Sequence, residues 1–398
     1  MHTIQDIDHL TGQRVLVRCD FNVPLDSNGH IVDDARIRAA LPTITYLQQH
    51  DARIILLSHL GRPHNAADTQ FSLKPVATRL AELLNHPVTF INESHGPRVL
   101  NIVNTMHNGD IIVLENVRFN SEEKGNDNER QHLAHEYAQL GDLFISDGFG
   151  VVHRKQASVY DIAQLLPSAA GFLIQKEVTN LNHILNNPQH PLTVILGGSK
   201  VSDKIGVITN LITTADTLLI CGGMSYTFLK AQGYEIGTSL VEPNMITFAQ
   251  QCLTQAKEQH TKLLLPTDLI VTDHFAADAQ PTTVPATHIP ATMMGMDIGE
   301  HTRQLFNTEI QKSSTIFWNG PAGVFEFPTF AHGTHALATS LQQATQHGAF
   351  TAIGGGDSVT AIHQFGFQES DFSYISTGGG ASLNFLEGKL LPGLRVLD

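Results

Sequence analysis

The sequence is poor in cysteine and in basic residues, and it has no long apolar run. Its three cysteines, Cys19, Cys221 and Cys252, are far apart and match neither a disulfide framework nor the ligand spacing of a metal site. No stretch approaches the roughly 18 consecutive apolar residues of a membrane-spanning helix. The first twelve residues lack the basic and apolar regions of a signal peptide. We therefore expect a cytoplasmic protein with reduced thiols and no membrane partner.

Acidic residues outnumber basic ones by 38 to 24, which gives a formal net charge of −14. A surface of that sign repels phosphate backbones, so we expect no nucleic-acid partner. The cations are unevenly placed, because 11 of the 13 arginines lie at or before Arg154, whereas every pair of adjacent glycines lies after it. The 22 histidines are scattered, and without a His-Glu-x-x-His run we expect most of them at ordinary polar positions. The two halves of the chain therefore differ in chemistry.

A length of 398 residues suggests two domains, at roughly 100–200 residues per domain. Short β-rich apolar runs alternate with segments of helical period, a pattern typical of parallel sheets wrapped by helices. The predicted strands are residues 14–17, 53–57, 110–114, 143–145, 193–196, 217–221, 262–265, 315–318, 350–353 and 374–376. The predicted helices are residues 35–49, 73–84, 129–140, 202–212, 244–258, 334–347 and 358–364. The fold class expected is α/β, with two doubly wound parallel-sheet domains.

The division between the domains is placed at a helix-like segment, residues 171–185, followed by two prolines that end it and lead into a strand. We accordingly expect a first domain at residues 1–170, an interdomain helix and hinge at 171–190, and a second domain from 191 to 380. In open α/β sheets, ligands bind beyond the carboxyl ends of the strands. Polar and glycine-rich segments follow the predicted strands in both halves, so each domain should have one chemically active edge. We expect the two edges to face each other across a cleft.

Five basic residues of the first half follow the predicted strands of this sheet: Arg36, His59, Arg62, Arg118 and Arg154. If they converge, they form a basic pocket, since the planar guanidinium group donates paired hydrogen bonds to phosphate or carboxylate oxygens. The alternative is that they are surface arginines paired with local acids. Asp20 and Asn22, in the first of these loops, could contact a hydroxyl and a carboxylate of the same ligand, although an Asp/Asn turn explains them equally well.

A glycine-rich segment in the second half, residues 197–204, ends a strand and opens a helix. Backbone amides at a helix start bind phosphate, and Lys200 and Lys204, four residues apart, should project from nearly one face. The segment is not a Walker loop, which requires Gly-x-x-x-x-Gly-Lys followed by Ser or Thr. A structural turn with solvated lysines remains the alternative.

Two further glycine-rich loops of the second half, residues 354–358 and 377–380, repeat this chemistry. The loop at residues 318–326 carries Glu326. Residues 354–358 add Asp357, which either caps the helix or ligates a Mg²⁺ ion bound to nucleotide phosphates. Residues 377–380 supply another amide-rich helix start. In residues 318–326, Glu326 could accept from ribose hydroxyls while Pro321 and Val324 contact a base, but a plain loop is possible too. No Gly-x-Gly-x-x-Gly occurs, which weighs against a dinucleotide-binding dehydrogenase.

Eight segments, in order along essentially the whole chain, closely resemble phosphoglycerate kinases. They are RCDFNVP (18–24), SHLGRP (58–63), LENVRF (114–119), SDGFGVVHR (146–154), GGSKVSDKI (197–205), WNGPAGVFE (318–326), GGGDS (354–358) and STGGGAS (376–382). The resemblance implies reversible transfer of the acyl phosphate of 1,3-bisphosphoglycerate to Mg-ADP, which gives 3-phosphoglycerate and ATP in glycolysis. It also implies a cytoplasmic, hinge-bending monomer whose C-terminal segment, residues 381–398, returns to the first domain.

By position, the resemblance assigns two sets of binding residues. Phosphoglycerate is expected at Asp20, Phe21, Asn22, Arg36, His59, Leu60, Gly61, Arg62, Arg118 and Arg154. The nucleotide is expected at Gly198, Ser199, Lys200, Lys204, Asn319, Pro321, Glu326, Gly355, Gly356, Asp357 and Ser358, with Asp357 nearest Mg²⁺. The catalytic residues implied are Arg36, Lys200 and Lys204. Three positions depart from the usual family residues: Ser199 and Gly148 stand where alanine is common, and Ser358 stands in place of threonine. A noncatalytic nucleotide sensor on the same fold is the competing hypothesis.

Overall fold

The computed structural model describes residues 1–397, and the chain forms two compact units. Residues 1–178 and the segment beginning at Leu390 make the first unit, and Thr179–Lys389 make the second. The division falls inside helix α5 (Phe172–Leu185), which begins in the first unit and ends in the second. No helix in the described part of the chain is long and apolar enough to cross a membrane.

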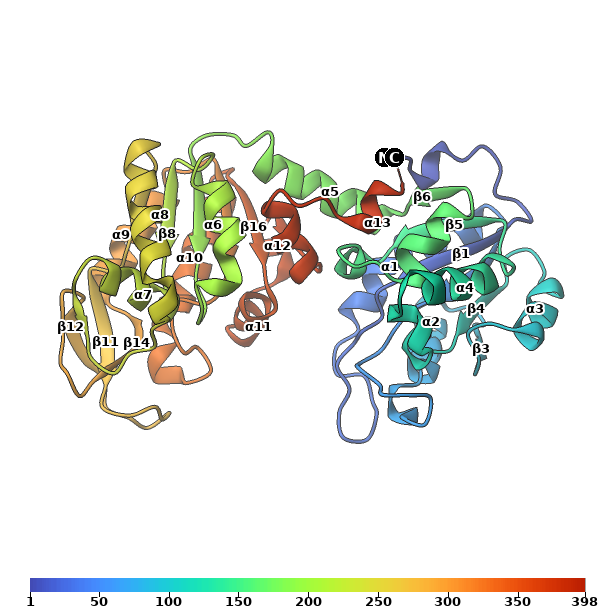
Figure 1. The fold of residues 1–398 in the computed structure, drawn as a ribbon, viewed down its shortest axis with the longest axis horizontal. Coiled ribbons are helices and arrows are strands. Elements are labelled where there is room, and N and C mark those ends of the chain that lie inside the picture. The colour runs from blue at the N-terminus through green and yellow to red at the C-terminus, as the bar shows by residue number, and fades with distance from the viewer. Residues whose placement is uncertain (398) are drawn as a thin grey trace. The chain divides into compact units, whose positions relative to one another are not determined.

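The first unit is built on a six-stranded parallel sheet with the strand order β3-β4-β2-β1-β5-β6 (Figure 1). Its strands are β1 (Arg14–Cys19), β2 (Arg53–Leu57), β3 (Thr89–Ile91), β4 (Ile111–Leu114), β5 (Leu143–Asp147) and β6 (Ser168–Ala170). Successive residues of β1 are buried on opposite faces. Val15 and Val17 pack with α1 (Ala35–Gln49) and α2 (Lys74–Leu84), whereas Leu16 packs with α3 (Pro97–Asn104) and α4 (Asp127–Ala138). The sheet is therefore apolar on both faces, as a sheet covered by helices on both sides must be.

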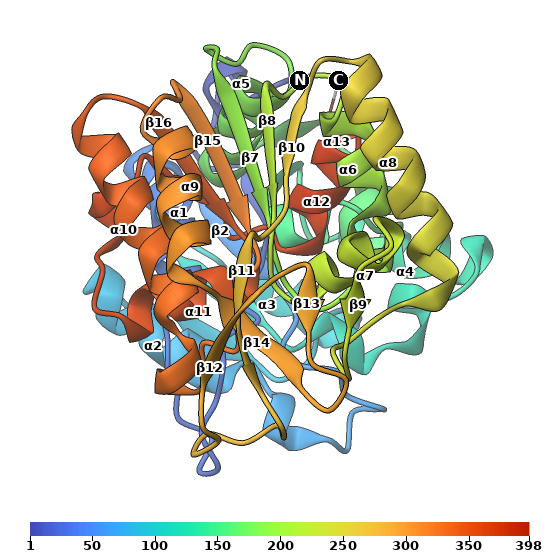
Figure 2. The same cartoon turned by 90° about the vertical axis from the view of Figure 1, so that its left-hand side faces the viewer.

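The second unit repeats this plan with a six-stranded parallel sheet of order β10-β8-β7-β15-β16-β17. The strands are β7 (Leu192–Leu196), β8 (Thr217–Ile220), β10 (Lys262–Leu264), β15 (Thr315–Asn319), β16 (Phe350–Gly354) and β17 (Tyr374–Ile375). Figure 2 shows α6 (Ile205–Leu211) and α8 (Ile246–Glu258) on one face, and α9 (Glu300–Ile310) and α10 (His332–Gln346) on the other. The predicted pair of helix-wrapped parallel sheets is confirmed.

The second unit also contains strands that the sequence pattern did not predict. An antiparallel sheet joins β11 (Asp268–Thr272) to β12 (Thr282–Pro285) and β14 (Met294–Ile298), and β9 (Glu235–Ile236) pairs with β13 (His288–Ile289). Residues of this region pack against α7 (Met224–Ala231) through Tyr226 and Leu229. The additional sheet supplies one wall of the pocket described below.

The C-terminal residues leave the second unit and pack on the first. After α11 (Gly356–Gln364) and α12 (Gly380–Leu386), the chain forms α13 (Pro392–Arg395), where the amide of Gly393 donates to the carbonyl oxygen of Val152 at 2.8 Å. The amide of His2 donates to the carbonyl oxygen of Leu397 at 2.7 Å, so the two ends of the described chain lie side by side (Figure 1). The first unit is thus assembled from two separate stretches of sequence.

Candidate functional site

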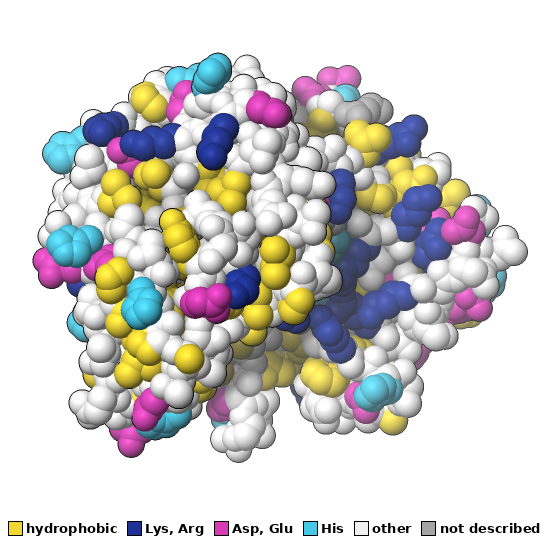
Figure 3. Space-filling view, turned by 60° about the vertical axis from the view of Figure 1, so that its left-hand side comes forward, with side chains coloured by type: hydrophobic (Ala, Val, Ile, Leu, Met, Phe, Trp, Pro, Cys, Tyr) yellow, Lys and Arg dark blue, Asp and Glu magenta, His cyan; other side chains and the backbone are white. Residues whose placement is uncertain are grey.

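The carboxyl ends of four strands in the first unit carry the polar residues that the sequence singles out. Asp20 follows β1, His59 follows β2, Arg118 follows β4, and Arg154 follows β5. Because these strands are parallel and adjacent, their ends meet at one edge of the sheet. Lys and Arg side chains gather on one side of this unit, at the right of Figure 3. The predicted convergence of basic groups is therefore present within the first unit.

Asp20 is a buried carboxylate at the centre of this group. Its Oδ2 atom accepts from Nη1 of Arg36, and its Oδ1 atom lies 3.9 Å from Nε2 of His59. Burial favours the neutral acid, but the charges of Arg36 and Arg18 and a hydrogen bond from the amide of Asn22 favour the carboxylate, and the pKa of Asp20 lies below its ordinary value. Burial lowers the pKa of His59 well below its ordinary value, and Arg18, Arg118 and Arg36 lower it further against the opposing effect of Asp20. The imidazole is therefore neutral at pH 7.

Three arginines at this edge have no acidic partner. Within residues 1–397, Arg62, Arg118 and Arg154 make no ion pair, unlike Arg38, which pairs with Asp34. The Nε atom of Arg118 is buried without a hydrogen-bond partner in the described structure, and its Nη1 atom donates to the carbonyl oxygen of Gly61 at 2.7 Å. Burial, together with Arg18 and Arg154, lowers the pKa of Arg118 to about 10. Unpaired guanidinium groups held close together are arranged to bind an anion, so pairing with local acids does not account for these three.

The other predicted residues of this site form its frame. The side chain of Asn22 accepts from the amide of Gly61 at 2.7 Å, which ties the loop after β1 to the loop after β2. Gly61 has a φ of +61°, and a Cβ atom there would lie 2.2 Å from the ring of Phe71. Phe21 and Leu60 are buried apolar side chains. Only their backbone groups could therefore touch a ligand.

Sequence reasoning missed three basic residues of this group: Arg18, Lys124 and His153. Burial, Arg118 and Arg154 lower the pKa of Lys124. His153 accepts from Nε of Arg154 at 2.9 Å, and burial followed by Arg154 lowers its pKa to about 4. Arg18 lies inside a strand that is buried on both faces, where a continuous run of apolar side chains is expected, so the sequence pattern gave no indication of its role.

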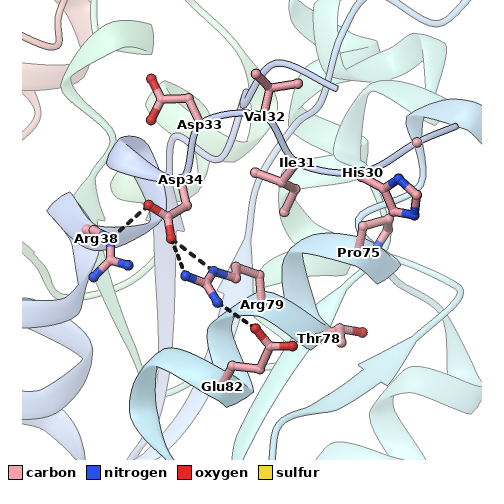
Figure 4. A pocket seen from close by; sticks show the side chains of 11 residues that line it. His30, Ile31, Val32, Asp33, Asp34, Arg38, Pro75, Thr78, Arg79 and Glu82 are labelled. Atoms are coloured by element: carbon pink, nitrogen blue, oxygen red, sulfur yellow. Dashed lines mark hydrogen bonds and ion pairs between the residues drawn. The ribbon is translucent and has the colours of Figure 1, made fainter. Parts of the chain in front are cut away.

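A hollow of the first unit with a volume of about 690 Å³ is lined by residues of the segment before α1, by Arg38 and by residues of α2. Figure 4 shows that its charged side chains bind one another: Asp34 accepts from both Arg38 and Arg79, and Arg79 also contacts Glu82. Its arginines are neutralised internally. This hollow is therefore not arranged as an anion site.

The second unit contains a pocket of about 510 Å³ at the carboxyl ends of its parallel strands. The pocket is lined by Gly198, Ser199, Gly222, Gly223, Tyr226, Thr238, Leu240, Phe275, Met294, Gly295, Met296, Pro321, Gly323, Val324, Glu326 and Asp357. Five of the predicted nucleotide-binding residues belong to this set: Gly198, Ser199, Pro321, Glu326 and Asp357. The loops after β7 and β16, which the sequence predicts to bind phosphate, therefore meet at one pocket with the loop after β15, predicted to contact ribose and base, and with the loop after β8. The third predicted phosphate loop, residues 377–380, does not line this pocket.

Glycine lets the backbones of these loops touch. The amide of Gly198 donates to the carbonyl oxygen of Pro321 at 2.9 Å, and the amide of Gly222 donates to that of Ala322 at 3.1 Å. A Cβ atom on Gly222 would lie 2.6 Å from the nitrogen of Gly198, a distance that leaves no room for any side chain. Hydrogen bonds between the loops therefore join them into one surface of the pocket. Some of the backbone amides of the loops are used in these bonds.

Lys200 and Lys204 do not share a helix face as expected. Lys200 is exposed in the loop before the 3₁₀ helix Ser202–Lys204, whereas Lys204 is buried and donates from Nζ to the carbonyl oxygen of Asn319 at 2.8 Å and to its side-chain oxygen. Burial lowers the pKa of Lys204 to about 8. The side-chain nitrogen of Asn319 is buried without a partner in the described structure, 3.0 Å from where a Cβ of Gly355 would stand. A phosphate oxygen at the Gly355 loop would satisfy it.

The helix start after β7 is occupied by a side chain of the protein. The carboxylate of Glu242 accepts from the amides of Val201 and Ser202 at 2.6 and 3.1 Å and from the hydroxyl of Ser202 at 2.6 Å. Sequence reasoning assigned these amides to phosphate, and that expectation is wrong for the described structure. The chemistry remains that of an anion at a helix start, but the anion is Glu242.

Asp357 lies in the first turn of α11, and its carboxylate is exposed at the pocket. Gly355 is the N-cap residue and no side chain caps this helix, so the alternative that Asp357 is the cap is wrong. Within the described residues, no group of three or more His, Cys, Asp or Glu side chains could hold a metal ion by itself. A single exposed carboxylate beside the phosphate-binding loops does fit Mg²⁺, since this ion takes one or two carboxylates together with phosphate oxygens.

Two of the departures from the usual family residues have a visible structural setting. The buried hydroxyl of Ser358 accepts from the amide of Gly320 at 2.7 Å and so keeps the function that a threonine hydroxyl would have. A Cβ atom on Gly148 would lie 3.1 Å from the carbonyl carbon of Cys19, so an alanine there would require a small shift of the β1 backbone. Nothing in the structure explains Ser199, which is exposed.

The apolar wall of the pocket was missed by sequence reasoning. Leu240, Phe275 and Met294 lie outside the glycine-rich segments that the sequence analysis singled out, and Phe275 is 62% exposed. The ring centroids of Phe275 and Phe327 lie 5.2 Å apart. An exposed aromatic side chain beside glycine-rich loops is suited to stack on a planar base.

Comparisons with known proteins extend over nearly all of the sequence. A family model described as "Phosphoglycerate kinase" matches residues 4–389. Phosphoglycerate kinases from Bifidobacterium adolescentis and Clavibacter sepedonicus are 53% and 50% identical to this chain over 402 and 403 residues, and each alignment covers 100% of this chain and at least 99% of the relative. The structure of phosphoglycerate kinase from Coxiella burnetii is similar with a TM-score of 0.89 at 40% identity, covering 99% of this chain and 98% of the other.

Proposed function

The chain belongs to the phosphoglycerate kinase family, and we propose that its first unit binds the phosphoglycerate while its second unit binds the nucleotide. The enzyme is a phosphotransferase of glycolysis. It transfers the acyl phosphate of 1,3-bisphosphoglycerate to ADP, giving 3-phosphoglycerate and ATP, and it catalyses the reverse reaction. The observation that carries the assignment of the first unit is the group of three arginines without acidic partners, Arg62, Arg118 and Arg154, beside Arg36 and His59.

In the first unit, arginine guanidinium groups bind the phosphate and carboxylate of phosphoglycerate. The hydroxyl of this ligand donates to the carboxylate of Asp20. Arg118 has a buried Nε–H free to donate, and Arg62 and Arg154 are exposed and able to move onto a phosphate. Asp20 accepts the ligand hydroxyl while it orients Arg36, and Asn22 and Gly61 hold the two loops together. Phe21 and Leu60 contribute only the backbone and the packing beneath it.

In the second unit, the nucleotide lies in the pocket that the glycine loops and the apolar wall enclose. The phosphates contact the loop Gly355–Ser358 and the unpartnered side-chain nitrogen of Asn319. Pro321 and Val324 contact the base, Glu326 accepts from the ribose, and Gly198, Ser199 and Lys200 border the phosphates. Asp357 would hold the Mg²⁺ that arrives with the nucleotide, and the ion would neutralise phosphate charge when bound.

The chemistry needs alignment and charge neutralisation more than proton transfer. The leaving group of the acyl phosphate is a carboxylate of low basicity, so it requires no general acid. Arg36 and Lys200 supply positive charge to the phosphoryl group as it moves, and Lys204 holds Asn319 in place. Direct transfer requires both ligands to share one phosphorus atom, so we infer a hinge-bending closure near residues 171–190 that excludes water. We further propose that the enzyme is a cytoplasmic monomer.

Formation of ATP from 1,3-bisphosphoglycerate and ADP, followed in a coupled assay with and without Mg²⁺, tests this function. The expected result is Mg²⁺-dependent ATP formation that is lost in Arg118→Met and retained in Arg98→Met, a matched control because Arg98 is exposed and pairs with Glu93. Binding of the nucleotide without turnover would instead favour the noncatalytic sensor. A cheaper first test is thermal stabilisation by ADP that depends on Mg²⁺.

The lowered pKa of Lys204 predicts a basic limb in the pH profile. Because burial lowers this pKa to about 8, the ammonium group loses its charge as the pH rises through about 8, well before an ordinary lysine does. We expect kcat/KM for Mg-ATP, which reports the free enzyme, to fall with a midpoint near that pH. Lys204→Arg, which cannot lose its proton, should move the fall to higher pH if the variant folds. A wild-type profile that stays flat to pH 10 would contradict the prediction.

A further inference from the structure

Arg18 is a fully buried arginine that the proposed mechanism does not use. It lies in β1 directly before Cys19 and is one of the largest side chains without solvent exposure. A buried guanidinium group stays charged and offers only donors, so each of its N–H groups needs an acceptor. Its Nε donates to the hydroxyl of Ser158 at 2.7 Å, and its Nη1 donates to the carbonyl oxygen of Cys19. Its Nη2 lies 3.4 Å from Nδ1 of His59.

The counter-charge of Arg18 is Glu123, which is also fully buried. Ser158 stands between the two charges, because its hydroxyl accepts from Arg18 and donates to Oε1 of Glu123 at 2.6 Å. The amide of Ser158 donates to Oε2 of Glu123 at 3.1 Å. Charge and hydrogen bonds therefore fix the position of the guanidinium group.

This arrangement decides which ring nitrogen of His59 carries hydrogen. Nη2 of Arg18 is a donor in every protonation state, so Nδ1 facing it must be the acceptor. The hydrogen of the neutral ring then lies on Nε2, which is 3.9 Å from Oδ1 of Asp20, at the centre of the basic group. A hydrogen on Nδ1 would set two donors against each other in a buried place.

We propose that Arg18 is a positioning residue that holds His59 in the tautomer with hydrogen on Nε2, so that the imidazole presents an N–H donor to the anionic acid. The second half of this statement rests on the proposed function, whereas the first half concerns the free protein. Arg18 does not touch the ligand itself. It acts through the ring, and the Ser158–Glu123 pair keeps it in place.

The tautomer is measured directly by nitrogen NMR of ligand-free protein containing labelled histidine. His59→Gln identifies the signals of His59 among those of the 22 histidines. The expected result is a proton on Nε2 and none on Nδ1 in the wild-type protein. In Arg18→Leu/Glu123→Gln, which removes both buried charges together, the ring is expected to populate both tautomers. A matched control, Glu123→Gln alone, retains Arg18 and should keep the wild-type tautomer.

Kinetics supply the second measurement. The double variant should raise KM for 3-phosphoglycerate about tenfold, the scale of weakening one hydrogen bond to a charged group, with KM for Mg-ATP unchanged. If the double variant does not fold, Arg18→Gln replaces it, because its amide can donate or accept and so releases the tautomer. Hydrogen on Nδ1 in the wild type, or an unchanged tautomer when Arg18 is replaced, overturns the proposal. Because the NMR measurement uses no substrate, it stays informative even if the proposed function fails.

Discussion

Replacing Arg36 by Ala is expected to lower kcat by at least about a hundredfold, the scale of losing one preorganised charge donor. Arg36 lies in the first turns of α1, and its Nη1 atom binds the buried carboxylate of Asp20. That contact holds the guanidinium group at the edge of the sheet where the unpaired arginines lie. Because the proposed role is exerted on the moving phosphoryl group, the loss should fall on kcat more than on either KM.

Arg38 provides the matched control, since it lies two residues further along the same helix and also pairs with an aspartate. It binds Asp34 in the internally neutralised hollow (Figure 4) and makes no contact with Asp20. Arg38→Ala should therefore retain wild-type kcat. Thermal unfolding of both variants separates a loss of chemistry from a loss of folding, because Arg36→Ala leaves Asp20 without one of its partners. Near-wild-type turnover in folded Arg36→Ala would refute its assigned role.

Replacing Asp147 by Asn is expected to remove a strong pH dependence of the stability of the first unit. Asp147 is fully buried at the end of β5, and its Oδ1 atom accepts from the amide of Leu173 at 2.9 Å, in the first turn of α5. Its Oδ2 atom has no partner in the described structure. Burial raises the pKa of this carboxyl from 3.8 to about 8. The folded protein therefore holds a proton that the unfolded chain releases near pH 4.

The sign of the effect follows from that difference. Between about pH 4 and pH 8 the folded state binds more protons at Asp147 than the unfolded state does, so raising the pH destabilises the fold. At 1.4 kcal/mol per pKa unit, the wild-type protein should lose about 3 kcal/mol of unfolding free energy between pH 5.5 and 8.5 through this group. An asparagine cannot ionise, so the variant should lose none of this contribution.

Urea unfolding at the two pH values, read by hydrogen exchange of the first-unit strands, measures the difference. Asp142→Asn is the control, because Asp142 lies near the opposite end of the same strand and its pKa is lowered by its hydrogen bonds to Arg14 against the effect of burial. It should keep the wild-type slope between pH 5.5 and 8.5. Equal slopes in wild type and Asp147→Asn would mean that the carboxyl is already ionised at pH 5.5.

The parallel sheets could be predicted because their central strands are continuous apolar runs. The predicted helix 35–49 coincides with α1, and the predicted strand 53–57 coincides with β2. The antiparallel sheet of the second unit could not be predicted in this way. In β12 only Val284 is buried, so the strand shows one apolar position among exposed ones. Its stability comes from pairing with β11, a tertiary interaction that local pattern does not encode.

The candidate site was predictable where it depends on unusual residue types at strand ends. Arg118 and Asp357 are such residues, and both lie where polar residues were expected. Glu242 and Phe275 were not predictable, because each lies far along the chain from the loops it meets and belongs to no glycine-rich segment. Lys204 was recognised, but its burial was not, since exposure depends on how the loop after β7 packs against β15.

Because the first unit is built from two separate stretches of sequence, its last elements are synthesised after all of the second unit. Every residue of the second unit precedes Leu390 in the chain, so the sequence of that unit is complete before the sequence of the first unit is. The contacts of Val152 and His2 with Gly393 and Leu397 can form only after those last residues have been synthesised. The half of the molecule that is translated first is thus the half that is finished last.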